Sequence, residues 1–120
     1  MRAVLIVDHG SRRPEANAQL DALVALVRAR RPGDFVTGAH LELAPPSVAE
    51  GLDACAAAGA SEIVIHPFLL APGRHVIEDL PRLASDAAIR HPRVSIRVGP
   101  PLGLHPRVVD AVLERIEEDS

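Results

Sequence analysis

Residues 4–12 read VLIVDHGSR, a short apolar run that ends abruptly in a polar turn. An apolar run without alternation is typical of a strand buried on both faces, as at the centre of a parallel α/β sheet. The strand would deliver His9 to the loop at its carboxyl end, beside Gly10, which allows a tight turn. Because ligands of open α/β sheets bind at that edge, we expect chemistry around His9.

The rest of the chain alternates between helical and strand patterns. Apolar spacing predicts a helix that starts near Pro14 and ends at Arg31, and a capping box of Ser47 and Glu50 predicts another that ends near Gly59. Further helices are expected at 79–89, with Pro81 in the first turn, and at 108–116, and further strands at 35–43, 63–68 and 94–98. The pattern predicts an α/β fold with a four-stranded parallel sheet, helices on both faces and the flavodoxin-like order 2-1-3-4.

Composition limits the function classes. The 120 residues suit one domain spanning 1–120, and 48% of them are hydrophobic, with two Phe and neither Trp nor Tyr. A net charge of -3 without a basic run argues against a nucleic-acid partner. No apolar run suits a membrane span or a signal peptide, so we expect a cytoplasmic protein without a membrane partner. The single cysteine, Cys55, is expected to be a buried packing residue.

Several titratable side chains should meet at one sheet edge. His9, His75 and His105 each follow a strand, His75 within a loop at 69–76, and Glu42 ends a strand on the same face as His40. If the first and third strands are neighbours, His9 and His75 flank one crevice. Two imidazoles there could bind a borderline metal such as Co, Ni or Fe, or accept a proton near neutral pH. The alternatives are a helix-capping role for His9 and an exposed, idle His75.

The remaining histidines and Ser11 suit structural roles. We expect His40 to be packed or partly exposed in its strand rather than a ligand, and His91 to be a surface residue at a helix end. Ser11 follows HG rather than lying in GxSxG, so we interpret it as a turn or cap residue. The chain also lacks the GxxxxGK[ST], GxGxxG, CxxC and HExxH motifs, which argues against nucleotide hydrolysis, dinucleotide redox chemistry and standard zinc sites.

Four segments together resemble the CbiX-type sirohydrochlorin chelatases: DHGSR, LELAPPSV, PFLLAPGRHVIEDLPRL and PPLGLHPRVVDAV. The resemblance extends along essentially the whole chain and is to the short, single-domain form. It implies ATP-independent insertion of Co2+, Fe2+ or Ni2+ into sirohydrochlorin, in cobalamin or siroheme biosynthesis. It also implies a lyase-type enzyme without a tightly bound cofactor, whose partners are sirohydrochlorin, the metal ion as substrate and a second copy in a homodimer.

The resemblance also implies roles for individual residues. His9 would be the catalytic proton acceptor and a metal ligand, with His75 the second ligand. Glu42 is a further acidic candidate, and Arg12, Arg13 and Arg74 could pair with substrate carboxylates. The macrocycle would be lined by Leu70, Ala71, Pro72, Gly73, Arg74 and His75.

The chain departs from the family pattern in several respects, one of which is Pro45 where some short members have a substrate-contacting glutamate. The aromatic of PxFLAxGxH is shifted by one position to Phe68, and His66 stands where an aliphatic residue is usual.

A non-catalytic metal or tetrapyrrole carrier using the same cleft is the alternative function. A phosphatase that works through a phosphorylated His9 is disfavoured. Such enzymes need an arginine just before the histidine, and here Asp8 would repel phosphate.

Overall fold

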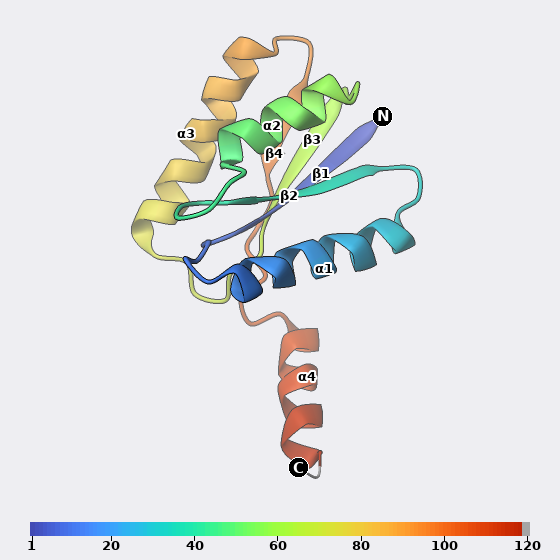
Figure 1. Ribbon diagram of the computed structural model, residues 1–120, viewed down its shortest axis with the longest axis vertical. Helices are drawn as coiled ribbons and strands as arrows, with labels where there is room; N and C mark the ends of the chain where they lie inside the picture. The colour runs from blue at the N-terminus through green and yellow to red at the C-terminus, as the bar shows by residue number, and fades with distance from the viewer. Residues whose placement is uncertain (119–120) are drawn as a thin grey trace.

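The computed structural model describes residues 1–118, so the last two residues of the expected domain lie outside the description. Strands and helices alternate along the whole described chain (Figure 1). The elements are β1 (Arg2–Asp8), α1 (Pro14–Arg30), β2 (Phe35–His40), α2 (Val48–Ala57), β3 (Glu62–Pro67), α3 (Arg74–Arg90), β4 (Ser95–Val98) and α4 (Pro106–Glu117). All strand pairs are parallel in the order β2-β1-β3-β4, which confirms the predicted topology.

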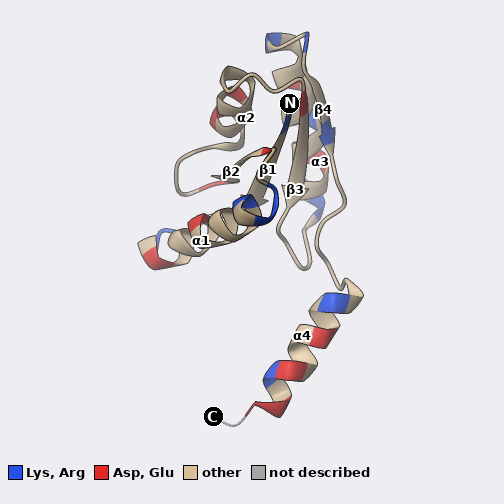
Figure 2. Ribbon diagram, turned by 90° about the vertical axis from the view of Figure 1, so that its right-hand side faces the viewer, with Lys and Arg blue, Asp and Glu red and all other residues tan. Residues whose placement is uncertain are grey.

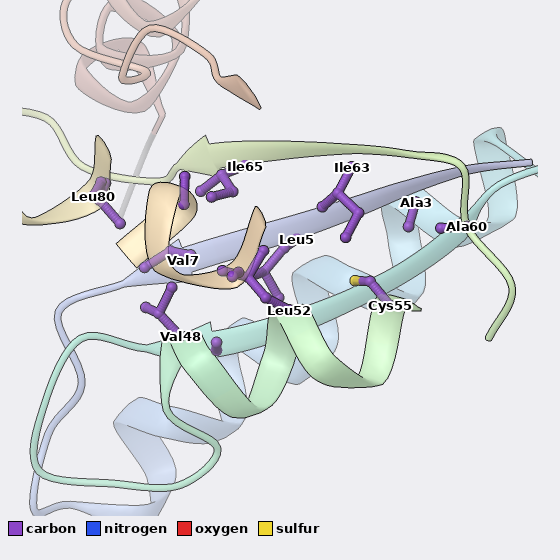
Figure 3. Packing of buried hydrophobic residues seen from close by; sticks show 13 residues of the cluster. Ala3, Leu5, Val7, Val48, Leu52, Cys55, Ala60, Ile63, Ile65 and Leu80 are labelled. Carbon is purple, nitrogen blue, oxygen red and sulfur yellow. The ribbon is translucent and has the colours of Figure 1, made fainter. Parts of the chain in front are cut away.

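Helices cover both faces of the sheet. On one face α2 and α3 bury the larger cluster, which includes Leu5, Leu52 and Ile65 (Figure 3). On the other face α1 buries a smaller cluster that includes Ile6 and Val24. Aliphatic side chains fill both clusters, so the scarcity of aromatic residues does not prevent a packed core. Cys55 is buried in the larger cluster, as expected, and burial raises the pKa of its thiol to about 11.

The strand predicted at 35–43 is shorter than expected. β2 ends at His40, and Leu43 adopts a φ of 68°, which turns the chain out of the extended conformation. The backbone N–H of His40 donates to the carbonyl of Pro46 (2.9 Å), so the connection folds back on the strand end. Glu42 therefore lies in the connection after β2, and the prediction that it shares a strand face with His40 was wrong.

The helix predicted at 79–89 starts earlier than expected. α3 begins at Arg74, after Gly73 in an extended N-cap conformation, and continues through Pro81 in its interior. His75 thus lies in the first helical turn, and its prediction as a loop residue was wrong. An interior proline removes one helical hydrogen bond, but Leu80, Ala84 and Ala87 anchor the helix to the core on either side of that position.

The last helix is present as predicted but covers neither face of the sheet. α4 projects away from the sheet (Figures 1 and 2), and every residue from Val109 to Glu118 is exposed. Hydrogen bonds from the N–H groups of Leu102 and Gly103 to the carbonyls of Pro67 (3.1 Å) and Leu69 (3.0 Å) fix the preceding loop. Within residues 1–118, the structure has no helix that is both long and apolar enough to cross a membrane.

Candidate active site at the carboxyl edge of the sheet

The loop after β1 is held tightly against the connection after β2. Glu42 donates its N–H to the carbonyl of His9 (3.1 Å), which extends the strand pairing beyond the ends of β1 and β2. Gly10 has a φ of 86°, and a Cβ on this residue would overlap the Glu42 carbonyl oxygen. Only glycine therefore fits between His9 and the neighbouring connection.

A second set of hydrogen bonds ties the same loop to α1. The Ser11 N–H donates to Asn17 Oδ1 (2.9 Å), and Asn17 Nδ2 donates to the Ser11 carbonyl (2.7 Å). The Ser11 hydroxyl accepts from the N–H of Arg13 (3.0 Å), which confirms Ser11 as a turn residue. The backbone on both sides of Gly10 is thus fixed, and the His9 side chain is carried by an ordered loop.

A buried histidine supports the end of β1. His40 is only 4% exposed, which decides between the packed and the partly exposed positions that the sequence left open, and its Nδ1 lies 2.5 Å from Asp8 Oδ1. This side-chain pair joins the ends of two neighbouring strands immediately before His9. The Asp8 carboxylate is partly buried and has lost part of its contact with water. Its contact with the His40 imidazole compensates for that loss.

A cavity of about 410 Å³ opens between this loop, the first turns of α1 and the segment after β3. His9 lies in its wall, and the facing wall is apolar. Phe68 and Leu70 present exposed apolar surface there (40% and 58%), which suits contact with a flat hydrophobic ring. The lining residues are Asp8, His9, Gly10, Ser11, Ala16, Asn17, Gln19, Leu20, Phe68, Leu69, Leu70 and Ala71.

Only part of the predicted site lines this cavity. His9, Leu70 and Ala71 do so, whereas Pro72 lines a separate apolar cavity on the α3 side. Gly73 and His75 lie at the start of α3, outside the cavity wall, with the His75 side chain exposed. Arg74 forms an exposed ion pair with Glu78 (3.1 Å), and Arg12 and Glu42 are exposed on the loops beside the cavity.

The two candidate metal ligands follow neighbouring strands, His9 directly after β1 and His75 in the first turn of α3, the helix that follows β3. β1 and β3 are adjacent and parallel, so His9 and the start of α3 lie at the same edge of the sheet. Both imidazoles are exposed, and within residues 1–118 no cluster of three or more His, Cys, Asp or Glu side chains is arranged to hold a metal. An arrangement with at most two protein ligands would leave coordination positions open.

The other histidines have structural environments. His105 caps α4, with Nδ1 accepting from the Arg107 N–H (3.1 Å). His91 lies at the end of α3, where Nε2 is 2.7 Å from Asp53 Oδ1, and this contact lowers the pKa of the carboxyl. His66 is half-buried in β3, and desolvation lowers its pKa.

Asn17 and Phe68 were not among the predicted site residues. Asn17 lies in a helix whose apolar spacing reveals only its buried face, and nothing in that spacing marks a hydrogen bond back to Ser11. Phe68 could have been found, because it was recognised as the shifted aromatic of the segment after β3.

Comparison with known proteins agrees with this architecture. The chain is 40% identical over 114 residues to a chloroplastic sirohydrochlorin ferrochelatase of Arabidopsis thaliana, covering 95% of this chain and 51% of that protein. It is 27% identical to a sirohydrochlorin cobaltochelatase of Methanococcoides burtonii, covering 96% of this chain and 94% of that protein. It spans about half the length of the first of these relatives.

A solved structure has the same fold. The sirohydrochlorin chelatase SirB of Bacillus subtilis subspecies spizizenii, in complex with cobalt, superposes with a TM-score of 0.88 and 34% identity, covering 97% of this chain and 50% of SirB. A family model for CbiX also matches residues 3–119. Together with the parallel sheet and the DHGSR loop, this match shows that the chain belongs to the CbiX family.

Proposed function

We propose that this chain, acting as one chelatase-like domain, inserts Co2+, Fe2+ or Ni2+ into sirohydrochlorin without ATP. The observation that carries the proposal is the position of His9, in the wall of an open, partly apolar cavity at the carboxyl edge of the sheet. The relatives support both iron and cobalt as the metal, since they are named ferrochelatases and cobaltochelatases. The product would enter siroheme or cobalamin biosynthesis.

The chemistry requires a base, releasable ligands and a flat cleft. Metallation removes two pyrrole N–H protons from the macrocycle while the metal ion loses water. His9 accepts a proton and binds the metal, and His75 is the second ligand. Since an imidazole must be neutral for both tasks, activity falls in acidic solution. A flat activity profile between about pH 5 and 8 would contradict this role.

The macrocycle lies against the segment of residues 70–75 in this proposal. Leu70 and Ala71 contribute cavity wall beside Phe68, and the apolar surface there suits the ring. The acid groups of the substrate would be held by Arg12, and Glu42 would contact the substrate from the connection after β2. No resident cofactor is needed, because the metal ion is a substrate.

We expect two copies of the chain to associate, so that each open cavity is covered. A water-excluding cover would strengthen electrostatic contacts to the metal and to the substrate carboxylates. Two of the apolar residues that line the cavity, Phe68 and Leu70, are exposed.

The test is an anaerobic absorbance assay of sirohydrochlorin with Co2+, Fe2+ or Ni2+. Wild type, His9→Ala and His75→Ala are compared with the spontaneous rate. His91→Ala is the matched control, because it removes an imidazole at the opposite end of α3. Acceleration that His9→Ala abolishes and His91→Ala retains would support the chelatase. Sirohydrochlorin binding with metallation at the spontaneous rate would instead support the carrier function.

A further inference from the structure

Asp8 lies in the wall of the same cavity as His9, one residue before it. Its side chain is 22% exposed, so the carboxylate is partly withdrawn from water and still open to the cavity. Among the described residues that line this cavity, Asp8 is the only acidic one, and none is Lys or Arg. No lysine or arginine of the cavity wall therefore neutralises its charge.

The Asp8 carboxylate is held by a buried imidazole. His40 Nδ1 lies 2.5 Å from Asp8 Oδ1, and the His40 side chain is only 5% exposed. An ionised carboxylate can only accept a hydrogen bond, so Nδ1 is the donor. The backbone is fixed as well, because the Leu41 N–H donates to the Asp8 carbonyl oxygen (2.9 Å). These contacts set the position of the carboxylate relative to the loop that carries His9.

The second carboxylate oxygen has no partner in the protein. The contact with His40 uses Oδ1, and within residues 1–118 the structure shows no hydrogen bond to Oδ2. A charge beside apolar cavity wall acts more strongly than the same charge in water, since the effective dielectric constant is lower. The acid groups of the macrocycle would be repelled by Asp8. The metal ion is the substrate of opposite charge.

We propose that Asp8, positioned by His40, holds the water shell of the incoming divalent metal ion beside His9. The Oδ2 atom accepts hydrogen bonds from metal-bound water, while His9 and His75 remain the ligands. His40 acts only through Asp8 and is a positioning residue. This inference rests on the proposed metal insertion and assigns to Asp8 the capture of the metal before it enters the ring.

Calorimetric titration with Co2+ alone tests the role of Asp8. Asp8→Asn removes the charge, whereas its amide oxygen still accepts the His40 N–H. We expect the Co2+ Kd to rise by about 10- to 100-fold, as for other outer-shell partners of a metal ion. Asp53→Asn is the matched control, because it removes an equal charge from another aspartate–histidine contact (2.7 Å to His91) that does not line the cavity. A wild-type chain that does not bind Co2+, or equal Kd values for the two variants, would overturn the proposal.

Two substitutions of His40 test whether it positions the carboxylate. His40→Asn can place an N–H donor where Nδ1 lies, whereas His40→Leu fills the space without a donor. We expect the Co2+ Kd of His40→Asn to stay close to that of wild type and the Kd of His40→Leu to rise. Urea denaturation confirms that each titrated chain is folded. Equal Co2+ Kd values for the two folded variants would show that His40 does not act through Asp8.

Steady-state metallation kinetics separate this inference from the proposed function. Asp8→Asn should raise KM for Co2+ and not KM for sirohydrochlorin, whereas partial unfolding would lower kcat without raising one KM alone. If wild type accelerates metallation and Asp8→Asn changes neither the Co2+ Kd nor KM for Co2+, the role of Asp8 is refuted and the chelatase stands. If Co2+ binding depends on Asp8 and wild type does not accelerate metallation, the capture of metal by Asp8 stands and the chelatase is refuted.

Discussion

His40 Nδ1 lies 2.5 Å from Asp8 Oδ1, and this pair joins the ends of β2 and β1 directly before His9. We expect His40→Ala to lower the free energy of unfolding by about 2–4 kcal/mol, because it leaves a cavity and a partly buried carboxylate without its partner. Asp8→Asn is the matched control, since an amide oxygen can still accept the imidazole N–H. Urea denaturation measures both variants, and equal losses would show that the hydrogen bond is not what stabilises this strand end.

Gly10 is predicted to be irreplaceable. Alanine there would need a positive φ and would overlap the Glu42 carbonyl oxygen, so the loop that carries His9 must move. We expect Gly10→Ala to lower stability by about 3 kcal/mol and to reduce metallation strongly. Gly33→Ala is the control, because a Cβ at Gly33 meets nothing within 4 Å. Thermal unfolding and the metallation assay are measured on both chains, and a Gly10→Ala protein as active as Gly33→Ala would refute the packing argument.

Asn17 is predicted to position the His9 loop. Its side chain both accepts from and donates to the Ser11 backbone, so Asn17→Ala removes two hydrogen bonds and frees the loop. We expect a loss of stability of about 1–2 kcal/mol and a larger relative loss in kcat than in substrate affinity. Asn17→Asp, which keeps the acceptor but not the donor, should fall between wild type and alanine. Steady-state metallation kinetics measure kcat and KM of the three chains. An unchanged kcat in Asn17→Ala would mean that other contacts hold the loop.

The sequence predicted the fold well because its signals are local. Buried runs, helical spacing and the Ser47–Glu50 capping box each act within a few residues, and the capping box is present as predicted. The start of α3 was missed because Pro81 was interpreted as a first-turn residue, whereas packing of Leu80 and Ala84 holds the helix through it. The direction of α4 was also beyond prediction, since hydrogen bonds between the loop after β4 and the segment after β3 set it.

The candidate site likewise contains residues that local sequence signals predicted and residues that only the folded chain brings together. His9 was found because an apolar run ends at it, and its place in the cavity wall follows from the strand order. Asn17 and the Asp8–His40 contact depend on which side chains meet in the folded chain, and Asp8 and His40 are 32 residues apart. The position of His40 inside a strand predicted a packed or partly exposed side chain, but it could not name the carboxylate that His40 contacts.

His66 is predicted to make the protein less stable in mild acid. Desolvation lowers its pKa in the folded chain, so the unfolded chain binds the proton first as the pH falls. At about pH 8 the imidazole is neutral in both states and adds no pH dependence. Below the ordinary histidine pKa near ~6.5, stability is lost until the pH reaches the lower folded pKa, and no further loss follows.

The matching substitution is His66→Val, which restores the aliphatic residue usual at this position in the family. It places an apolar side chain beside Val64 and Ile6 in the sheet and removes the titrating group. We expect it to raise the free energy of unfolding by about 1 kcal/mol at pH 8, from added apolar burial, and by more at pH 5. Urea denaturation of both chains at the two pH values measures the difference in unfolding free energy between His66→Val and wild type. The contributions of the other histidines cancel in this difference. If this difference in unfolding free energy stays constant or becomes smaller toward pH 5, desolvation of His66 does not limit stability in acid.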